Sequence, residues 1–167
     1  MASALRLLFL LCGLSGLLTG VESYPTSYSK RNDCPQEWTQ LDSKCYIFEN
    51  EPRTFSDAES VCNILGGNLA SILNGLENAI VLEVFRAGGE DTEAWIGFFD
   101  SLEADNYIWT DGSDGSFTNF DTRATTPEPN SATGNCVELD RNDGFWQTRS
   151  CSDDNVFICI RDVHHPH

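Results

Sequence analysis

The chain has 167 residues and a formal net charge of −16, which is enough length for one globular domain once its ends are set aside. A surface this acidic argues against nucleic acid as a partner, because nucleic-acid binding requires basic patches. The same acidity favours solubility and supplies the oxygen ligands that hard cations such as calcium prefer.

Residues 1–23 have the pattern of a secretory signal peptide. Arg6 supplies a positive charge, residues 7–18 form an apolar run, and Val21 and Ser23 fit the small-residue positions before a cut. The apolar run has about twelve residues, too short to span a bilayer, which disfavours the alternative of a retained membrane anchor. No later stretch is long enough either, so we expect a secreted, extracellular protein without a membrane span.

The cysteine count also fits secretion. Loss of Cys12 with the signal peptide leaves six cysteines, and an even number behind a secretory signal predicts three disulfides. None of them forms a Cys-x-x-Cys pair, so neither a redox motif nor a zinc ribbon is expected. The six are Cys34, Cys45, Cys62, Cys136, Cys151 and Cys159.

Three segments follow from composition alone. Residues 24–33 are a polar leader that carries Lys30-Arg31, which is either part of a disordered segment or a processing site. No composition shift divides residues 34–161, which we expect to form one domain. Residues 162–167 contain all the histidines of the chain; we expect a disordered tail, with a weak transition-metal site as the alternative.

Two helices are predicted in the first half of the domain. The first is expected to begin with a capping box of Ser56 and Glu59 and to end at Gly66-Gly67. The second is expected to be capped by Asn74 and to end at Gly88-Gly89. Apolar residues recur at helical spacing in both and are assigned to the core. They are Ala58, Val61, Cys62 and Leu65 in the first helix, and Leu76, Ile80, Val81, Val84 and Phe85 in the second.

Strands are predicted at residues 44–48, 94–99, 107–109, 136–139 and 156–160, where aromatic, branched and apolar residues run together. Two early helices followed by a series of strands indicate an α+β fold with helices segregated from an antiparallel sheet. Histidine is absent from the body of the domain, so His-assisted nucleophilic catalysis has no base. Phosphate-binding and zinc-protease motifs are absent as well, and we expect no enzyme.

The cysteine order, a Trp95-Ile96-Gly97 strand and Glu128-Pro129-Asn130 ahead of Cys136 together resemble the C-type lectin-like domain over about residues 34–161. The resemblance implies two helices flanking antiparallel sheets, a long loop region, and a single-domain secreted lectin of fish or invertebrate type. It also implies the pairings Cys34–Cys45, Cys62–Cys159 and Cys136–Cys151.

In sugar-binding members of that family, one calcium ion is held by the Glu and Asn that flank a cis proline, by a Glu just before the next cysteine, and by a Trp-Asn-Asp motif. The resemblance therefore implies Glu128, Asn130 and Gln147 as metal ligands, and Glu-Pro-Asn implies mannose-type sugars. Two departures weaken this calcium site, because affinity follows ligand charge. Gly134-Asn135 replaces the Glu before the cysteine, and Gln147-Thr148 follows Trp146 in place of Asn-Asp.

Further residues complete the candidate set. Asn135 and Thr148 join the three metal-ligand candidates as carbohydrate-binding residues. Asn135, Asp140 or Asp143 would compensate for a lost ligand, and Asp100 with Glu103 is the candidate for an auxiliary calcium site.

Two hypotheses follow. The first is a secreted, mannose-type, carbohydrate-binding lectin with a role in innate defence. The second is a lectin-fold protein without calcium-dependent sugar binding, whose loop face takes a protein, a mineral or ice; threonines crowd residues 122–133. The sequence leaves the oligomeric state open.

Overall fold

The computed structural model describes residues 34–101, 106–123 and 125–163. The predicted signal peptide and leader, Glu103 and the histidines of the tail lie outside the described residues. In the part that is described, no helix is long and apolar enough to cross a membrane.

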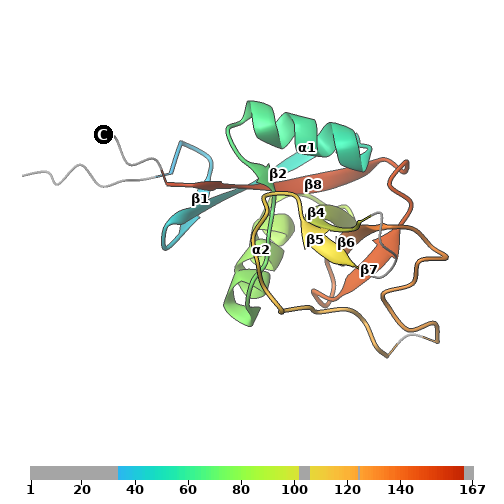
Figure 1. Cartoon of the computed structure of the whole chain (residues 1–167). Coiled ribbons are helices and arrows are strands. Elements are labelled where there is room, and N and C mark those ends of the chain that lie inside the picture. Colours follow the sequence, from blue (N-terminus) through green and yellow to red (C-terminus); the bar gives the residue numbers. More distant parts are fainter. Residues whose placement is uncertain (1–33, 102–105, 124, 164–167) are drawn as a thin grey trace, which may run out of the picture. The chain divides into compact units, whose positions relative to one another are not determined.

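One eight-stranded sheet organises the domain, with the strand order β1-β2-β8-β4-β6-β7 and with β3 and β5 paired to β8 and β4 (Figure 1). All neighbours are antiparallel except β4 and β8. The strands are β1 (Thr39–Leu41), β2 (Lys44–Arg53), β3 (Asn68–Leu69), β4 (Glu93–Asp100), β5 (Tyr107–Trp109), β6 (Cys136–Asp140), β7 (Trp146–Arg149) and β8 (Asn155–Asp162). The predicted α+β class is confirmed; the sequence missed only the short strands β1, β3 and β7.

The two helices, α1 (Phe55–Ile64) and α2 (Gly75–Gly88), lie on opposite faces of the sheet (Figure 1). Alternation along β8 makes this possible, since neighbouring side chains of a strand point to opposite faces. Ile158 and Ile160 pack in the core that contains the buried face of α2, whereas Phe157 and Cys159 pack in the core under α1. Each helix is therefore held by its own apolar layer.

The start of α1 differs from the prediction. Its N-cap is Thr54, whose hydroxyl accepts a hydrogen bond from the backbone N–H of Asp57 at 3.3 Å, and Ser56 lies inside the first turn. The capping box of Ser56 and Glu59 is therefore wrong. Thr54 and Asp57 have the same spacing as Ser56 and Glu59, so the pattern alone did not separate the two starts.

Helix α2 begins at the predicted cap, because Oδ1 of Asn74 accepts from the backbone N–H groups of Leu76 and Glu77, each at 3.0 Å. The predicted burial of Leu76 is wrong: it is 61% exposed. It lies two residues before the buried Asn78, which on a helix is a rotation of roughly 200° away from the core-facing side. The buried stripe consists of Asn78, Val81, Leu82, Val84 and Phe85.

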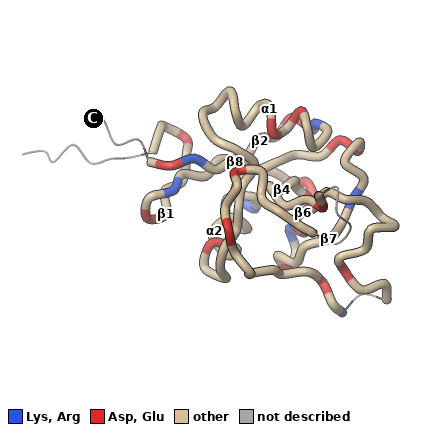
Figure 2. Tube along the Cα trace, viewed as in Figure 1, with Lys and Arg blue, Asp and Glu red and all other residues tan. Residues whose placement is uncertain are grey.

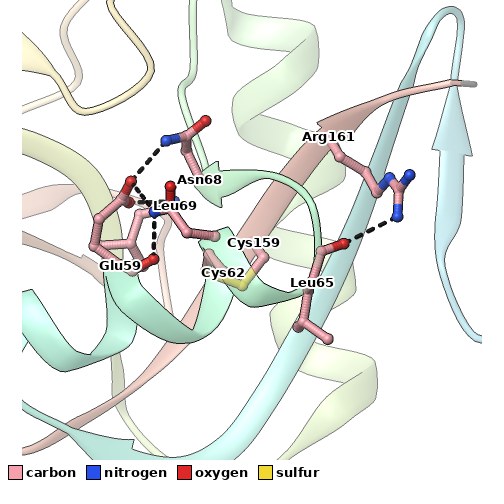
Figure 3. The surroundings of a disulfide bond; sticks show 8 residues. Glu59, Cys62, Leu65, Asn68, Leu69, Cys159 and Arg161 are labelled. Atoms are coloured by element: carbon pink, nitrogen blue, oxygen red, sulfur yellow. Dashed lines mark hydrogen bonds between the residues drawn. A yellow bond between two sulfur atoms is a disulfide. The ribbon is translucent and has the colours of Figure 1, made fainter.

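The disulfides are those that the family resemblance implies. Cys62–Cys159 ties α1 to β8 (Figure 3), and Cys136–Cys151 links β6 to the residues just after β7. Cys34–Cys45 closes the β1–β2 hairpin. Figure 2 shows acidic residues along both helices and in the loops, with the few lysines and arginines scattered among them.

Candidate functional site

The candidate site lies at β7, the last strand in the order of the sheet, and in the loop that precedes β6. The peptide bond between Glu128 and Pro129 is cis, as the family resemblance implies. From this turn the loop runs beside β7 to the disulfide-bonded Cys136. Binding residues concentrate in loops carried by a rigid sheet, which makes this loop the candidate binding surface.

The carboxylate of Glu128 faces the outer edge of β7. Its Oε2 accepts the backbone N–H of Thr148 at 3.0 Å and the Thr148 hydroxyl at 2.5 Å. The backbone N–H of Asn130 donates to the same oxygen at 3.1 Å. One carboxylate oxygen thus satisfies a strand-edge N–H, a turn N–H and a hydroxyl, and the charge strengthens each of these hydrogen bonds.

Thr148 is the buried centre of this arrangement, with only 4% of the residue exposed. Besides Glu128, its Oγ1 lies 2.9 Å from the Asn130 carbonyl oxygen, 3.1 Å from the Asn130 nitrogen and 2.6 Å from the Thr133 hydroxyl. A hydroxyl has one proton to donate and two lone pairs. The short contact to the charged carboxylate takes the proton, and the Asn130 N–H and the Thr133 hydroxyl can donate to the two lone pairs. The Asn130 carbonyl oxygen is an acceptor, so it competes with Glu128 for the proton.

Asn130 uses its oxygens to shape the loop. Its Oδ1 accepts the backbone N–H of Ala132 at 3.1 Å, and its carbonyl oxygen accepts the Thr133 N–H at 2.9 Å and the Thr133 hydroxyl at 2.7 Å. A side-chain oxygen that accepts from the backbone two residues later forms a local turn. The amide oxygen of Asn130 is therefore already engaged.

The structure places Gln147 away from this group. Gln147 stands opposite Glu138 in the β6–β7 pairing, and Arg149, two residues further on, forms an ion pair with Glu138 at 3.3 Å. Side chains alternate along a strand, so Gln147 shares a face with Arg149, and Thr148 shares the other face with the buried Trp146. Within the described residues no hydrogen bond joins Gln147 to the turn at Glu128.

Asn135 lies at the other end of the loop and is exposed. Its carbonyl oxygen accepts the backbone N–H of Asp100 at 2.7 Å, which fixes the loop to the end of β4. A shallow hollow of about 340 Å³ opens beside it. Its lining consists of Ser131, Ala132, Thr133, Gly134, Asn135, Ser150 and Cys151.

Asp143 is bound elsewhere. It pairs with Arg123 at 2.5 Å, and Arg123 also pairs with Asp121 at 2.9 Å and stacks 4.0 Å above the Phe145 ring. These hydrogen bonds raise the pKa of Arg123 and lower the pKa of Asp121. The cluster fastens the loop between β5 and β6 to the β6–β7 turn, where Asp140 accepts the Asn142 N–H at 2.6 Å.

Glu138 is a charged group next to the site that sequence reasoning did not select. Its side chain is 3% exposed and contacts Arg149 at 3.3 Å and the Asn155 amide at 2.9 Å. Burial raises the pKa of Glu138 to about 7, although Arg149 and Asn155 act in the opposite direction. The sequence of β6, Cys-Val-Glu-Leu, alternates in a way that suggests an exposed Glu138. Residues on both faces of β6 are buried in the structure, and this burial could not be predicted from the alternation.

The donor set does not fit the calcium ion that the family implies. Calcium takes about six to eight oxygens, and its affinity follows the number of charged ligands. The turn offers one carboxylate, Glu128, and Oε2 of that carboxylate holds three internal hydrogen bonds. The amide oxygen of Asn130 is engaged as well. No cluster of three or more His, Cys, Asp or Glu side chains suited to a metal occurs among the described residues.

At the auxiliary position, Asp100 is buried and accepts the backbone N–H of Asn106 at 3.0 Å. The second candidate, Glu103, lies outside the described residues. Asp100 therefore has a role in closing the turn between β4 and β5, and the auxiliary site stays a prediction.

Residues 51–161 match the family model described as the Lectin C-type domain, and the chain belongs to this family. It is 31% identical over 157 residues to the galactose-specific lectin nattectin of Thalassophryne nattereri, covering 93% of this chain and 94% of nattectin. The structure is similar to human lithostathine (TM-score 0.71, 30% identity, 77% of this chain and 99% of that one). It is also similar to the herring type II antifreeze protein (TM-score 0.69, 25% identity, 78% and 100%). At the level of the family, the protein is a binding module and not an enzyme.

Proposed function

We propose that the protein is a secreted carbohydrate-binding lectin whose ligand contacts the loop face, defined as Glu128 to Asn135 together with the outer edge of β7. Family membership supports the carbohydrate, and the cis Glu128-Pro129 turn with Asn130 beside it carries the assignment to this face. Innate defence is the setting that we propose for such a secreted lectin.

The proposed sugar is of the mannose type. The second carboxylate oxygen of Glu128 takes no part in the hydrogen bonds that hold the turn in the described structure, and Asn130 follows one residue after the proline. An acceptor beside an amide suits two neighbouring sugar hydroxyls, since each hydroxyl both donates and accepts. Glu-Pro-Asn favours mannose-type sugars, whereas the relative nattectin is by name galactose-specific.

The remaining candidates take different roles in this proposal. Asn135 lines the hollow beside the turn and would contact a second sugar unit. Gln147 would contact ligand from the half-buried face of β7. Thr148 is buried, so it acts through Glu128 and Asn130 and not by touching the sugar.

Binding of mannose and galactose ligands by calorimetry, together with a glycan array, tests the proposal. We expect mannose-type glycans to bind and Glu128→Ala to remove most of that binding. The matched control is Glu83→Ala, which removes an exposed carboxylate of α2 that forms an ion pair with Arg86. Equal loss in both variants, or no glycan binding by the wild-type protein, would refute the proposal.

A second candidate function is ice binding by the loop face together with the residues just before it. The similarity to the herring antifreeze protein and the exposed threonines Thr122, Thr125, Thr126 and Thr133 favour it. Thermal hysteresis measured on the purified protein distinguishes the two: ice binding predicts hysteresis without glycan binding.

A further inference from the structure

Four polar groups from separate parts of the loop face converge on a single hydroxyl. Oγ1 of Thr148 lies 2.5 Å from Oε2 of Glu128, 2.9 Å from the Asn130 carbonyl oxygen, 3.1 Å from the Asn130 nitrogen and 2.6 Å from the Thr133 hydroxyl. Thr148 is 4% exposed, so little water competes for these contacts. The hydroxyl therefore joins β7, the cis turn and the following loop in one network.

A calcium ion at such a place would draw oxygens together by charge. Here the negative charge of Glu128 is met instead by three donors, the N–H groups of Asn130 and Thr148 and the Thr148 hydroxyl. Hydrogen bonds to an ionised carboxylate are among the stronger ones in proteins. A metal would have to break them to reach Oε2, and among the described residues no cluster of three or more acidic, His or Cys side chains is available to bind it.

The backbone of Arg149 leaves no room for one of the calcium ligands of the family. Gly134 stands just ahead of Cys136, where sugar-binding members carry a ligand Glu, and it has φ +150°. A Cβ atom at Gly134 would lie 2.0 Å from the carbonyl carbon of Arg149, so no side chain fits there. At Gly134 the loop packs directly against the backbone of β7 and does not surround an ion.

We propose that Thr148 is a positioning residue that holds the loop face in its binding shape in place of calcium, so that this lectin recognises its ligand without a metal. The proposal rests on the function proposed above for the same face. In a calcium-loaded site the charge of the ion would order the loop; here the buried hydroxyl of Thr148 orders it.

Hydrogen exchange of residues 128–135 in EDTA and in about 5 mM calcium tests the ordering itself, at a concentration above the dissociation constants of weak extracellular calcium modules. We expect wild-type protection and melting temperature to be the same in both. Thr148→Val, which keeps the shape and removes the hydroxyl, should lower loop protection by about tenfold or more. Thr148→Ser, which keeps a hydroxyl, should retain the loop protection of the wild type. Calcium-dependent protection of the wild type, or full protection in Thr148→Val, would overturn the proposal.

The variant Thr148→Asp gives a second test. It places a carboxylate against Glu128 in place of the hydroxyl, so we expect loop protection in EDTA to fall below that of the wild type. Protection equal to that of the wild type in this variant would contradict the proposal. None of these readouts uses a sugar, so a wild-type loop that is ordered without metal yet binds no glycan would refute the proposed function alone.

Discussion

The indole nitrogen of Trp146 donates a hydrogen bond to Oδ1 of Asn78 at 2.8 Å, and this contact joins α2 to the start of β7. The same Asn78 donates from its Nδ2 to the Gly144 carbonyl oxygen at 3.1 Å. Both partners of the first bond are buried, with Trp146 fully enclosed. Helix α2 thus helps to position the start of β7, the strand that carries Thr148.

Asn78→Leu should destabilise the domain by about 1–3 kcal/mol, because it leaves a buried indole N–H without a partner, whereas the Gly144 carbonyl oxygen keeps the Asn119 amide at 2.7 Å. Denaturant unfolding measures the change. The control is Leu76→Ala on the same helix; its side chain is largely exposed, and we expect a change below about 0.5 kcal/mol. Equal effects of the two substitutions would contradict the assignment.

Glu138 should make stability depend on pH near neutrality. The pKa of Glu138 is about 7 in the folded protein, above the ordinary value of 4.5, so the folded state holds a proton that the unfolded state has already lost. Its contribution to the free energy of unfolding is full below about pH 4.5 and decreases as the pH rises through 7. The difference between pH 5 and pH 8 should be on the order of 2 kcal/mol.

Glu138→Gln removes this titration while keeping the size of the side chain. The gap in unfolding free energy between wild type and variant should therefore change with pH over this window, and other titrating groups cancel in the comparison. A gap that stays constant from pH 5 to pH 8 would show that Glu138 remains charged beside Arg149 throughout.

Glu59 links α1 to β3. Its Oε2 accepts the backbone N–H of Leu69 at 2.7 Å, and its Oε1 accepts the Asn68 amide at 2.6 Å (Figure 3). Glu59→Ala should cost about 1–3 kcal/mol, since the Leu69 N–H loses its partner in a partly buried place. Glu51→Ala, which removes only the exposed partner of Arg53, should cost less than about 1 kcal/mol. Thermal melts of both variants measure the two costs, and equal melting temperatures would contradict the role assigned to Glu59.

Gly134→Ala should unseat the loop face while leaving the sheet intact. The new methyl group would collide with the Arg149 backbone, so residues 131–135 must move. We expect glycan affinity to fall at least tenfold, roughly the effect of losing one good contact of about 1.4 kcal/mol. As a control, Gly75→Ala meets nothing within 4 Å and should leave binding unchanged. An unaltered affinity in Gly134→Ala would place the ligand elsewhere.

Much of the fold was predictable because the signals are local. The helix at Asn74, the strands β4 and β6, and the α+β class followed from periodicity, turn residues and element order. The disulfide pairing followed from resemblance, because six cysteines alone permit many connectivities. Where two starts had the same spacing, as at Thr54 and Ser56, the pattern selected the wrong one.

The sequence by itself determined that this chain forms a lectin-like domain with a Glu-Pro-Asn turn and that its calcium ligands are depleted. Only the tertiary structure decided that Thr148 contacts Glu128, because Thr148 lies 20 residues beyond Glu128 and meets it only when β7 folds beside the loop. Tertiary packing likewise buried the side chain of Glu138 and thereby raised its pKa. Local patterns report the period and the caps of an element, whereas a hydrogen-bond network depends on which strands become neighbours.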